Sequence, residues 1–381
     1  MGKAFSKELK PVRNTEMNIN ISPSALYNAL TSVALACDKD QPNCLLATEE
    51  DYAFAVGSGH SMEYTSRNIK CEVVEHGIIG VHVSDFMNIV KGFRGSDSIN
   101  VRSGDKSVIV SYQLSVYELP LIPQGEVPVS MHEQVDFDNV CTIDSDMLHD
   151  HLASLDRCAP QQDVRYTLNG INFDFSNDKL NLVATNGQIM SVAEIPVENC
   201  KGGSYTVPKG GDVLGALKKM LSTAGEEVDI GFSHNFIQVE LTNGEALRGR
   251  LIDGRYVDWR RVMQPIGDDE GELVVFKRLE LLNVLDRLTT VSLKTLRINL
   301  FPGQATFQLA QKAINSGTEI MMCQGNATIE FGINPTLLKD ILNATCGHEE
   351  EVAIKIQSIN GLIKVLARET NRIGGIMPCK L

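Results

Sequence analysis

The side chains best suited to chemistry are two histidines that flank an aspartate, His149-Asp150-His151, because imidazole and carboxylate groups are common metal ligands. The apolar spacing around them predicts a helix over 144–158, on which residues two positions apart point in well-separated directions. The two imidazoles therefore do not share a face, and a solvated helix surface is the simpler interpretation. A metal-dependent nuclease or transferase that uses this helix stays open as an alternative function.

Other catalytic and ligand-binding motifs are missing from the sequence. It has no Walker-type phosphate loop, no Gly-x-Ser-x-Gly nucleophile turn, no His-Glu-x-x-His zinc motif and no EF-hand loop. Its nine cysteines include no Cys-x-x-Cys pair, which argues against a zinc ribbon and favours reduced thiols in a cytosolic protein. We therefore expect no metal site, no cofactor and no catalytic residue.

The elements that position these side chains follow a repeat. The same pattern occurs six times. An apolar residue that favours β-strands is followed by residues that typically begin a helix, and then by a helix with one apolar face. Ser22, Ser84, Asp144 and Asn334 are typical N-cap residues, and Pro23 and Pro335 suit the first helical position. The starts lie roughly 60 residues apart, which predicts helices within 22–37, 84–95, 144–158, 208–223, 276–292 and 334–347.

Between the helices the apolar residues alternate, which predicts antiparallel strands. Ile99–Arg102 and Val108–Ser111 flank Ser103–Lys106 and predict a hairpin. Similar hairpins are predicted for 228–232 with 236–241, 296–300 with 306–309, and 352–356 with 362–366.

The predicted fold class is α+β, because each repeat contains one helix and about three or four strands. Two repeats make a domain of usual size, so six repeats predict three similar domains. Proline-rich and glycine-rich stretches at 120–128 and 264–271 suit the boundaries. We expect a flexible extension over 1–16 and domains over 17–134, 135–265 and 266–381.

The 381-residue chain has a formal net charge of −13, which argues against a protein that coats nucleic acid. Acidic and basic residues nearly balance within the six predicted helices, however. The acidic excess therefore lies outside the helices.

Four segments of the sequence resemble the bacterial sliding clamps, the beta subunit of DNA polymerase III. They read DVRYTLNG over 163–170, LVATNG over 182–187, LIDGRYVDWRRV over 251–262 and IMPCKL over 376–381, and they lie at the distances typical of that family. The resemblance implies the DNA clamp fold, with six repeats per chain and a homodimeric ring whose helices line the hole. It also implies a cytoplasmic, non-catalytic processivity factor of DNA replication that associates with the nucleoid and not with a membrane.

The resemblance implies several partners as well. These are encircled double-stranded DNA bound without sequence specificity, the catalytic subunit of the DNA polymerase, the clamp loader and other proteins with a clamp-binding motif. On the loop implied to touch DNA lie Gln162, Arg165, Tyr166 and Thr167. Basic residues expected to contact phosphates from the inner wall are Lys91, Arg94, Lys209, Lys218, Lys219, Lys277 and Arg278.

A partner-peptide groove between the second and third domains is also implied by the resemblance. The positions that match the family's groove are Leu168, Thr185, Gly187, Met190, Val257, Arg261, Val262, Met377, Pro378, Cys379 and Leu381. The family's groove residues are replaced at Gln188-Ile189, Val257 and Cys379-Lys380, so we expect an apolar groove of altered shape. These departures leave open whether the gene is chromosomal or carried by a phage or plasmid.

The dimer is expected to form head-to-tail. One side would be an edge strand of the first domain near Val108 and Val110, and the other would be the third domain near Val291. A scaffold that binds proteins without encircling DNA is the second alternative function.

Overall fold

The computed structural model describes residues 16–381 except 94, 96, 128–134, 177, 199, 226, 265–269, 292–294, 310–316 and 348. The expected extension over 1–16 therefore lies almost wholly outside the described residues. The chain divides into an N-terminal unit, 1–146 with 211–251, and a C-terminal unit, 147–210 with 252–381.

The six predicted helices are confirmed. They are α1 (Pro23–Val33), α2 (Val83–Gly92), α3 (Ser145–Leu155), α4 (Val213–Leu221), α6 (Arg278–Val291) and α7 (Pro335–Cys346). Asn334 caps α7 by accepting from two backbone N–H groups at 3.0 and 3.2 Å, and Ser22 caps α1. Ser84 is not a cap, because α2 begins one residue earlier and follows His82. No helix in the described part of the chain has both the length and the apolar character needed to cross a bilayer.

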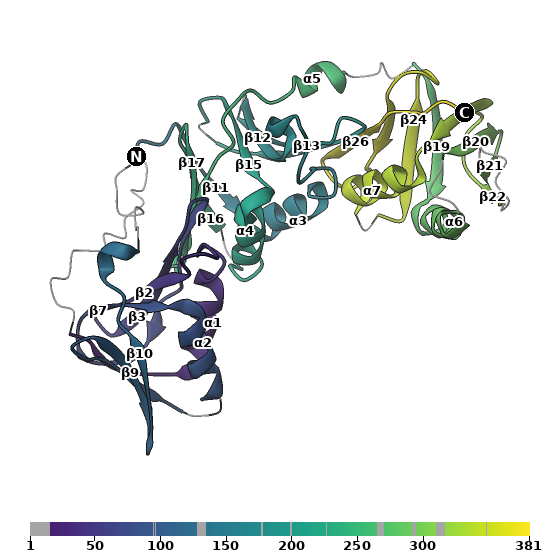
Figure 1. The fold of residues 1–381 in the computed structure, drawn as a ribbon. Coiled ribbons are helices and arrows are strands. Elements are labelled where there is room, and N and C mark those ends of the chain that lie inside the picture. Colours follow the sequence, from purple (N-terminus) through teal and green to yellow (C-terminus); the bar gives the residue numbers. More distant parts are fainter. Residues whose placement is uncertain are drawn as a thin grey trace. The chain divides into compact units, whose positions relative to one another are not determined.

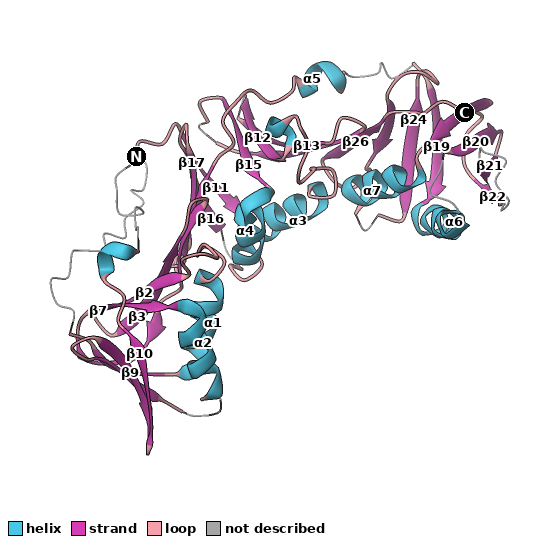
Figure 2. Ribbon diagram, viewed as in Figure 1, coloured by secondary structure: helices cyan, strands magenta, loops and turns pink. Residues whose placement is uncertain are grey.

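The N-terminal unit contains two antiparallel sheets, and α1 and α2 lie side by side against them (Figure 2). The five-stranded sheet has the order β10 (Ser115–Pro120), β9 (Ser107–Tyr112), β8 (Ile99–Ser103), β1 (Asn18–Ile21) and β6 (Glu72–Glu75). The nine-stranded sheet has the order β11 (Asn139–Asp144), β16 (Glu227–Phe232), β17 (Phe236–Glu240), β18 (Ala246–Arg250), β4 (Met62–Thr65), β3 (Tyr52–Ser58), β2 (Asn43–Glu49) and β7 (Ile78–His82), with β5 (Ile69–Lys70) beside β3.

The C-terminal unit also contains two antiparallel sheets (Figure 1). The eight-stranded sheet has the order β15 (Gly203–Pro208), β12 (Gly170–Ser176), β13 (Lys179–Thr185), β14 (Ile189–Pro196), β26 (Arg372–Ile376), β25 (Ile363–Leu366), β24 (Glu351–Ile356) and β19 (Glu272–Lys277). The four-stranded sheet has the order β22 (Thr318–Met322), β21 (Gln304–Leu309), β20 (Leu296–Phe301) and β23 (Ile329–Ile333). Short helical turns are η1 (Gln124–Glu126), η2 (Tyr166–Leu168), η3 (Gly210–Asp212) and α5 (Trp259–Val262).

The larger sheet of each unit joins strands from different predicted domains. In the nine-stranded sheet, β18 pairs with β4, and Arg248 lies opposite Glu63. In the eight-stranded sheet, β14 pairs with β26, and Val192 lies opposite Ile373. All four predicted hairpins are present, but these two pairings could not be read from local patterns. The domain boundaries at 134 and 265 stay a prediction.

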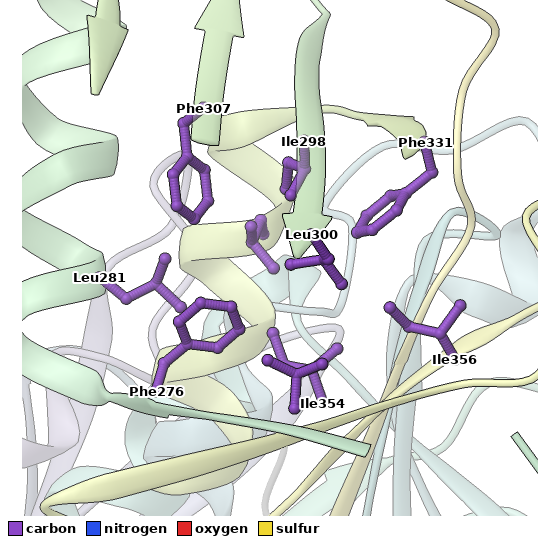
Figure 3. Close-up of a pocket in the computed structure, with 10 residues that line it drawn as sticks. Phe276, Leu281, Ile298, Leu300, Phe307, Phe331, Ile354 and Ile356 are labelled. Atoms are coloured by element: carbon purple, nitrogen blue, oxygen red, sulfur yellow. The ribbon is translucent and has the colours of Figure 1, made fainter. Parts of the chain in front are cut away.

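The core between α6, α7 and the sheets at the C-terminal end is closed and apolar (Figure 3). The rings of Phe276 and Phe307 meet nearly edge-on, with centroids 6.3 Å apart. A cavity of about 10 Å³ remains beside them, among side chains such as Ile298, Phe331 and Ile354. Because it is apolar and hardly larger than one water molecule, it is a packing gap and not a ligand site.

Helix α7 packs very closely on β26 (Figure 1). Gly374 faces the helix, and a Cβ atom at this position would lie 2.8 Å from Ile341 Cγ1 and closer still to Thr345 Oγ1. The absence of a side chain at Gly374 therefore lets the helix dock on the strand.

Replacing Gly374 with alanine should lower the free energy of unfolding by about 1–3 kcal/mol, because the added methyl group overpacks this contact. Urea unfolding of Gly374→Ala measures the change. The matched control is Gly361→Ala, where the nearest atom, Ser358 Cβ, would be 3.5 Å away and no cost is expected. Equal losses in the two variants would contradict the close docking of α7.

Candidate functional site

An apolar cluster covers part of one face of the eight-stranded sheet. Its buried members are Leu168, Val183, Met190, Val192, Tyr256 and Met263, with Trp259, Leu362 and Ile373 packed against them. Cross-strand register places Val183, Val192 and Ile373 on one face, opposite the face that Gly374 turns to α7. The sheet is therefore apolar on both faces here, one under a helix and the other under loops.

The turn between β13 and β14 borders this cluster. Thr185 Oγ1 donates to Ile189 O at 2.6 Å and accepts from Gly187 N at 3.0 Å. Asn186 Oδ1 accepts from the backbone N–H groups of Gln188 and Ile189. Gly187 has a φ of +85°, and a Cβ atom there would lie 2.5 Å from Arg165 Nη1. The turn is thus tightly held and needs glycine for both its backbone and its space.

The C-terminal segment crosses beside the same turn. Met377 N donates to Gln188 O, and Cys379 N donates to Gly332 O of β23, each at 2.9 Å. Leu381 packs on Gly332. The side chains of Met377 and Leu381 stay 42% and 49% exposed, while Pro378 and Cys379 are half-buried. The segment therefore offers apolar side chains to solvent along a backbone that is fixed at two points.

The short helix α5 lies on this face too. Asp258 caps it by accepting from Arg261 N at 3.3 Å. Val257 and Val262 are 38% and 47% exposed, and Arg261 is exposed. The eleven predicted groove residues all belong to the C-terminal unit: Leu168, Thr185 and Met190 are buried, and Val257, Val262, Met377 and Leu381 are exposed apolar residues.

The loop before η2 carries a rigid basic group. Arg165 donates from its backbone N and its Nε to Asp163 Oδ1 at 2.8 and 2.9 Å, and from Nη2 to Asp163 Oδ2 at 2.7 Å. Nη2 also donates to Asn186 O at 2.9 Å, which joins this loop to the β13–β14 turn. These hydrogen bonds from Arg165 lower the pKa of the Asp163 carboxyl to about 2. Gln162 and Tyr166 are exposed, and Thr167 is half-buried.

The predicted phosphate contacts on the helices differ in exposure. Lys91, in the last turn of α2, and Lys219, in the last turn of α4, are exposed, and Lys218 is half-buried. Lys277 is exposed and lies 3.6 Å from Glu280. Arg94 lies outside the described residues.

Comparison with known proteins agrees with this geometry. The model of the "DNA polymerase III beta subunit, central domain" family matches residues 142–258. The beta sliding clamp of Pseudomonas putida is 24% identical over 377 residues, which are 96% of this chain and 100% of the relative. That of Haemophilus influenzae is 26% identical over 313 residues, 79% of this chain and 82% of the relative.

Solved structures match along the same length. The DNA polymerase III subunit beta from Pseudomonas aeruginosa has a TM-score of 0.87 and 23% identity, and the beta sliding clamp of Caulobacter crescentus has 0.86 and 21%. Each match covers 96% of this chain and 100% of the other. The fold is therefore the clamp fold.

The matches in sequence and in fold support the interpretation of this chain as a divergent bacterial sliding clamp.

Two of the predicted phosphate contacts of this chain need correction. Arg278 is only 8% exposed, and its Nε donates to Glu349 O at 2.8 Å, so it belongs to the interior. Lys209 Nζ donates to the carbonyl oxygens of Asp156 and Ala159 at 2.7 and 2.9 Å, just after α3 ends. Both cations satisfy backbone carbonyls near helix ends, a role that sequence alone does not distinguish from phosphate binding.

The predicted dimer strand also needs correction. Val108 and Val110 are fully buried in the chain's own core, and their strand β9 lies between β8 and β10. The free edge of this sheet is β10, where Val116 and Tyr117 are 66% and 47% exposed. Val291, at the end of α6, is 39% exposed, and its place in the dimer interface stays a prediction.

His151 is not on a solvated helix surface, contrary to the simpler interpretation of its sequence. It is 7% exposed, and its Nδ1 accepts from Arg372 Nε at 2.9 Å. The guanidinium of Arg372 also binds Ser154 Oγ at 3.0 Å and the carboxylate of Asp150. Burial and the Arg372 charge lower the pKa of His151 to about 4. The pair therefore fixes α3 to β26, with the imidazole neutral.

This lowered pKa predicts a pH dependence of stability. Between pH 6.5 and 4 the unfolded chain binds a proton at His151 that the folded chain does not, so stability is lost as the pH falls through this window. From pH 7 to pH 5 the loss due to His151 should be about 2 kcal/mol. Urea unfolding of His151→Gln at the two pH values should show a smaller loss than the unaltered chain, with His149→Gln as the matched control. Equal losses for His151→Gln and the unaltered chain would contradict the His151–Arg372 pairing.

Proposed function

We propose that this chain is a DNA sliding clamp that encircles duplex DNA and tethers the replicative DNA polymerase, which confers processivity. The observation that carries the proposal is the match to beta sliding clamps over nearly the whole chain, in sequence and in fold. The clamp acts in DNA replication, on the DNA in the cytoplasm.

Charge supports this function. A ring holds DNA by topology, so its inner wall needs only weak, sequence-independent attraction to phosphates. The near balance of charge on the helices suits such a wall, and the acidic excess elsewhere opposes binding of DNA to the outside. The proposed DNA contacts are Gln162, Arg165, Tyr166, Thr167, Lys91, Lys218, Lys219 and Lys277.

The apolar face of the eight-stranded sheet supports the partner assignment. Val257, Val262 and Met377 are exposed, and Leu168 and Met190 belong to the apolar cluster on the same unit, which suits a short peptide with apolar side chains. The polymerase, the clamp loader and other proteins with a clamp-binding motif would bind here in turn.

Two exposed edge strands support a head-to-tail homodimer. Strand β10 presents Val116, and Leu114 just before it is fully exposed. Strand β22 is an edge of the four-stranded sheet and presents Ile320 and Met322, which are 60% and 73% exposed. Unpaired edges with apolar side chains favour association, so β10 of one protomer would pair with β22 of its partner.

The clamp would be non-catalytic, without cofactor or metal. The metal-enzyme alternative needs both histidines of α3, and His151 Nδ1 is already bound by Arg372. Among the residues that the structure describes, no three His, Cys, Asp or Glu side chains converge on a possible metal site.

Run-off from circular DNA tests encirclement. The chain is loaded by its cognate clamp loader onto a nicked circle, and the circle is then cut once. A ring should dissociate from the linear DNA through the free ends, whereas DNA with blocked ends should retain it. Retention on open linear DNA, or binding without the loader, would instead favour a chemical DNA binder, and no DNA association at all would favour a scaffold.

Replacing Val116 with aspartate should break the ring, because the charge would be buried in the proposed interface. Sedimentation should give a monomer for Val116→Asp at micromolar concentration and a dimer for the unaltered chain. Val74→Asp is the matched control, since Val74 is 60% exposed on β6 at the opposite edge of the same sheet. A dimer in the Val116→Asp variant would refute this interface.

A further inference from the structure

Helix α5 is too short to hold its own position. It has four residues, fewer than an isolated helix needs to be stable. None of its residues is buried, although Trp259 is partly covered by the apolar cluster. Contacts with other elements must therefore place it on the sheet, and with it the exposed side chains of Val257, Arg261 and Val262.

The first contact is made by Asp174, in the middle of β12. Its Oδ2 accepts from Trp259 Nε1 at 2.6 Å and is ion-paired with Arg260. The carboxylate side chain is 13% exposed, so its charge is largely withdrawn from water and needs these partners. Asp174 lies on the same sheet face as Val183, beside the apolar cluster.

Arg260 extends this contact along the strand. Its Nη2 donates to Ser176 Oγ at 2.6 Å, and its guanidinium lies 4.4 Å from the centre of the Trp259 ring. Such stacking is a favourable cation–π arrangement. Asp174 and Ser176, two residues apart on β12, thus bind both residues that begin α5, whereas Arg261 and Val262 stay exposed.

The second contact is made by Lys364 of β25, where α5 ends. Lys364 is only 4% exposed, and its Nζ donates to Met263 O at 3.5 Å and to Gln264 O. The ammonium thus satisfies carbonyl groups that follow the last turn of α5. One end of α5 is fixed to β12, and the other is fixed to β25 across β13, β14 and β26.

We propose that Asp174 is a positioning residue for partner binding, which holds α5 as one wall of the groove through Trp259 and Arg260, with Lys364 as the second anchor. The proposal rests on the proposed function, because it assigns the groove to partner peptides. It goes beyond the residues predicted to touch a partner, since neither Asp174 nor Lys364 is among them.

The consequence is a separation of two roles within α5 and the residues just before it. Trp259 and Arg260 bind the sheet, whereas Val257, Arg261 and Val262 are left for the partner. Loss of the Asp174 carboxylate does not change these three residues. It removes the contact that holds their backbone on the sheet, so their backbone becomes mobile. An unfixed wall must be ordered when the partner binds, and that ordering lowers affinity.

The test measures polymerase affinity in primer extension with the cognate polymerase and clamp loader. Asp174→Ala should raise the polymerase concentration for half-maximal stimulation about tenfold, while maximal stimulation, run-off and the dimer stay unchanged. Asp174→Asn keeps an acceptor for Trp259 and loses the ion pair, so its effect should be smaller. Should Asp174→Ala fail to fold, Arg260→Ala, at a 47% exposed side chain, should raise the same concentration.

The matched control is Glu194→Gln. Glu194 is on the same sheet, and its Oε1 is 2.8 Å from Lys179 Nζ in an exposed ion pair whose partner belongs to β13 and not to α5. Half-maximal stimulation in this variant should require the same polymerase concentration as in the unaltered chain. A chain without Cys379–Leu381 should not stimulate the polymerase. This variant gives the reference value for complete loss of partner binding in the groove.

Trp259 gives a direct second readout, because it is the only tryptophan of the chain. In Asp174→Ala its emission should shift to longer wavelength and acrylamide should quench it more strongly, with no such change in Glu194→Gln. Unchanged half-maximal concentration or unchanged emission in Asp174→Ala would overturn the proposal and leave the clamp function standing. Absence of stimulation by the unaltered chain would overturn the proposed function and this inference together.

Discussion

The antiparallel pairing of β14 with β26 is the interaction on which the C-terminal unit depends. It joins strands from distant parts of the sequence, from Ile189 opposite Ile376 to Ala193 opposite Arg372. Without it, one continuous eight-stranded sheet would become two sheets with exposed edges. Because the sheet is continuous, α7 can pack on one face at Gly374 while the apolar cluster forms on the other. The candidate groove is thus a product of sheet continuity.

The same strand pairing explains why a charge is buried at its end. Arg372 begins β26, and its side chain is 1% exposed. Burying a guanidinium is costly unless every donor finds a partner, and Asp150, His151 and Ser154 of α3 supply them. Apolar side chains would tolerate sliding of α3 along the sheet, whereas these directed hydrogen bonds fix one position. Burial of the Arg372 charge costs free energy, but the hydrogen bonds that compensate for it fix α3 in one position on the sheet.

The parts of this fold that sequence predicts are those that local periodicity determines. Neighbouring residues predict helices α1 and α7 through their apolar spacing and through the capping residues Ser22 and Asn334. They also predict the hairpin of β8 and β9. Burial of Arg278 and His151 depends instead on elements that the sequence places far away, and nothing in their own neighbourhood marks it. Resemblance supplied the groove residues, but it did not supply Asp174 or Lys364, which act through α5.

Divergence in the groove follows from how its walls are held. The C-terminal segment is fixed by backbone hydrogen bonds, from Met377 N to Gln188 O and from Cys379 N to Gly332 O. Such bonds do not depend on side-chain identity, so Gln188 and Cys379 can replace other residues while the segment keeps its place. Helix α5 differs, because side chains hold it at both ends. Substitutions that line the groove therefore change which partner fits, whereas substitutions at the anchors of α5 change how well any partner is held.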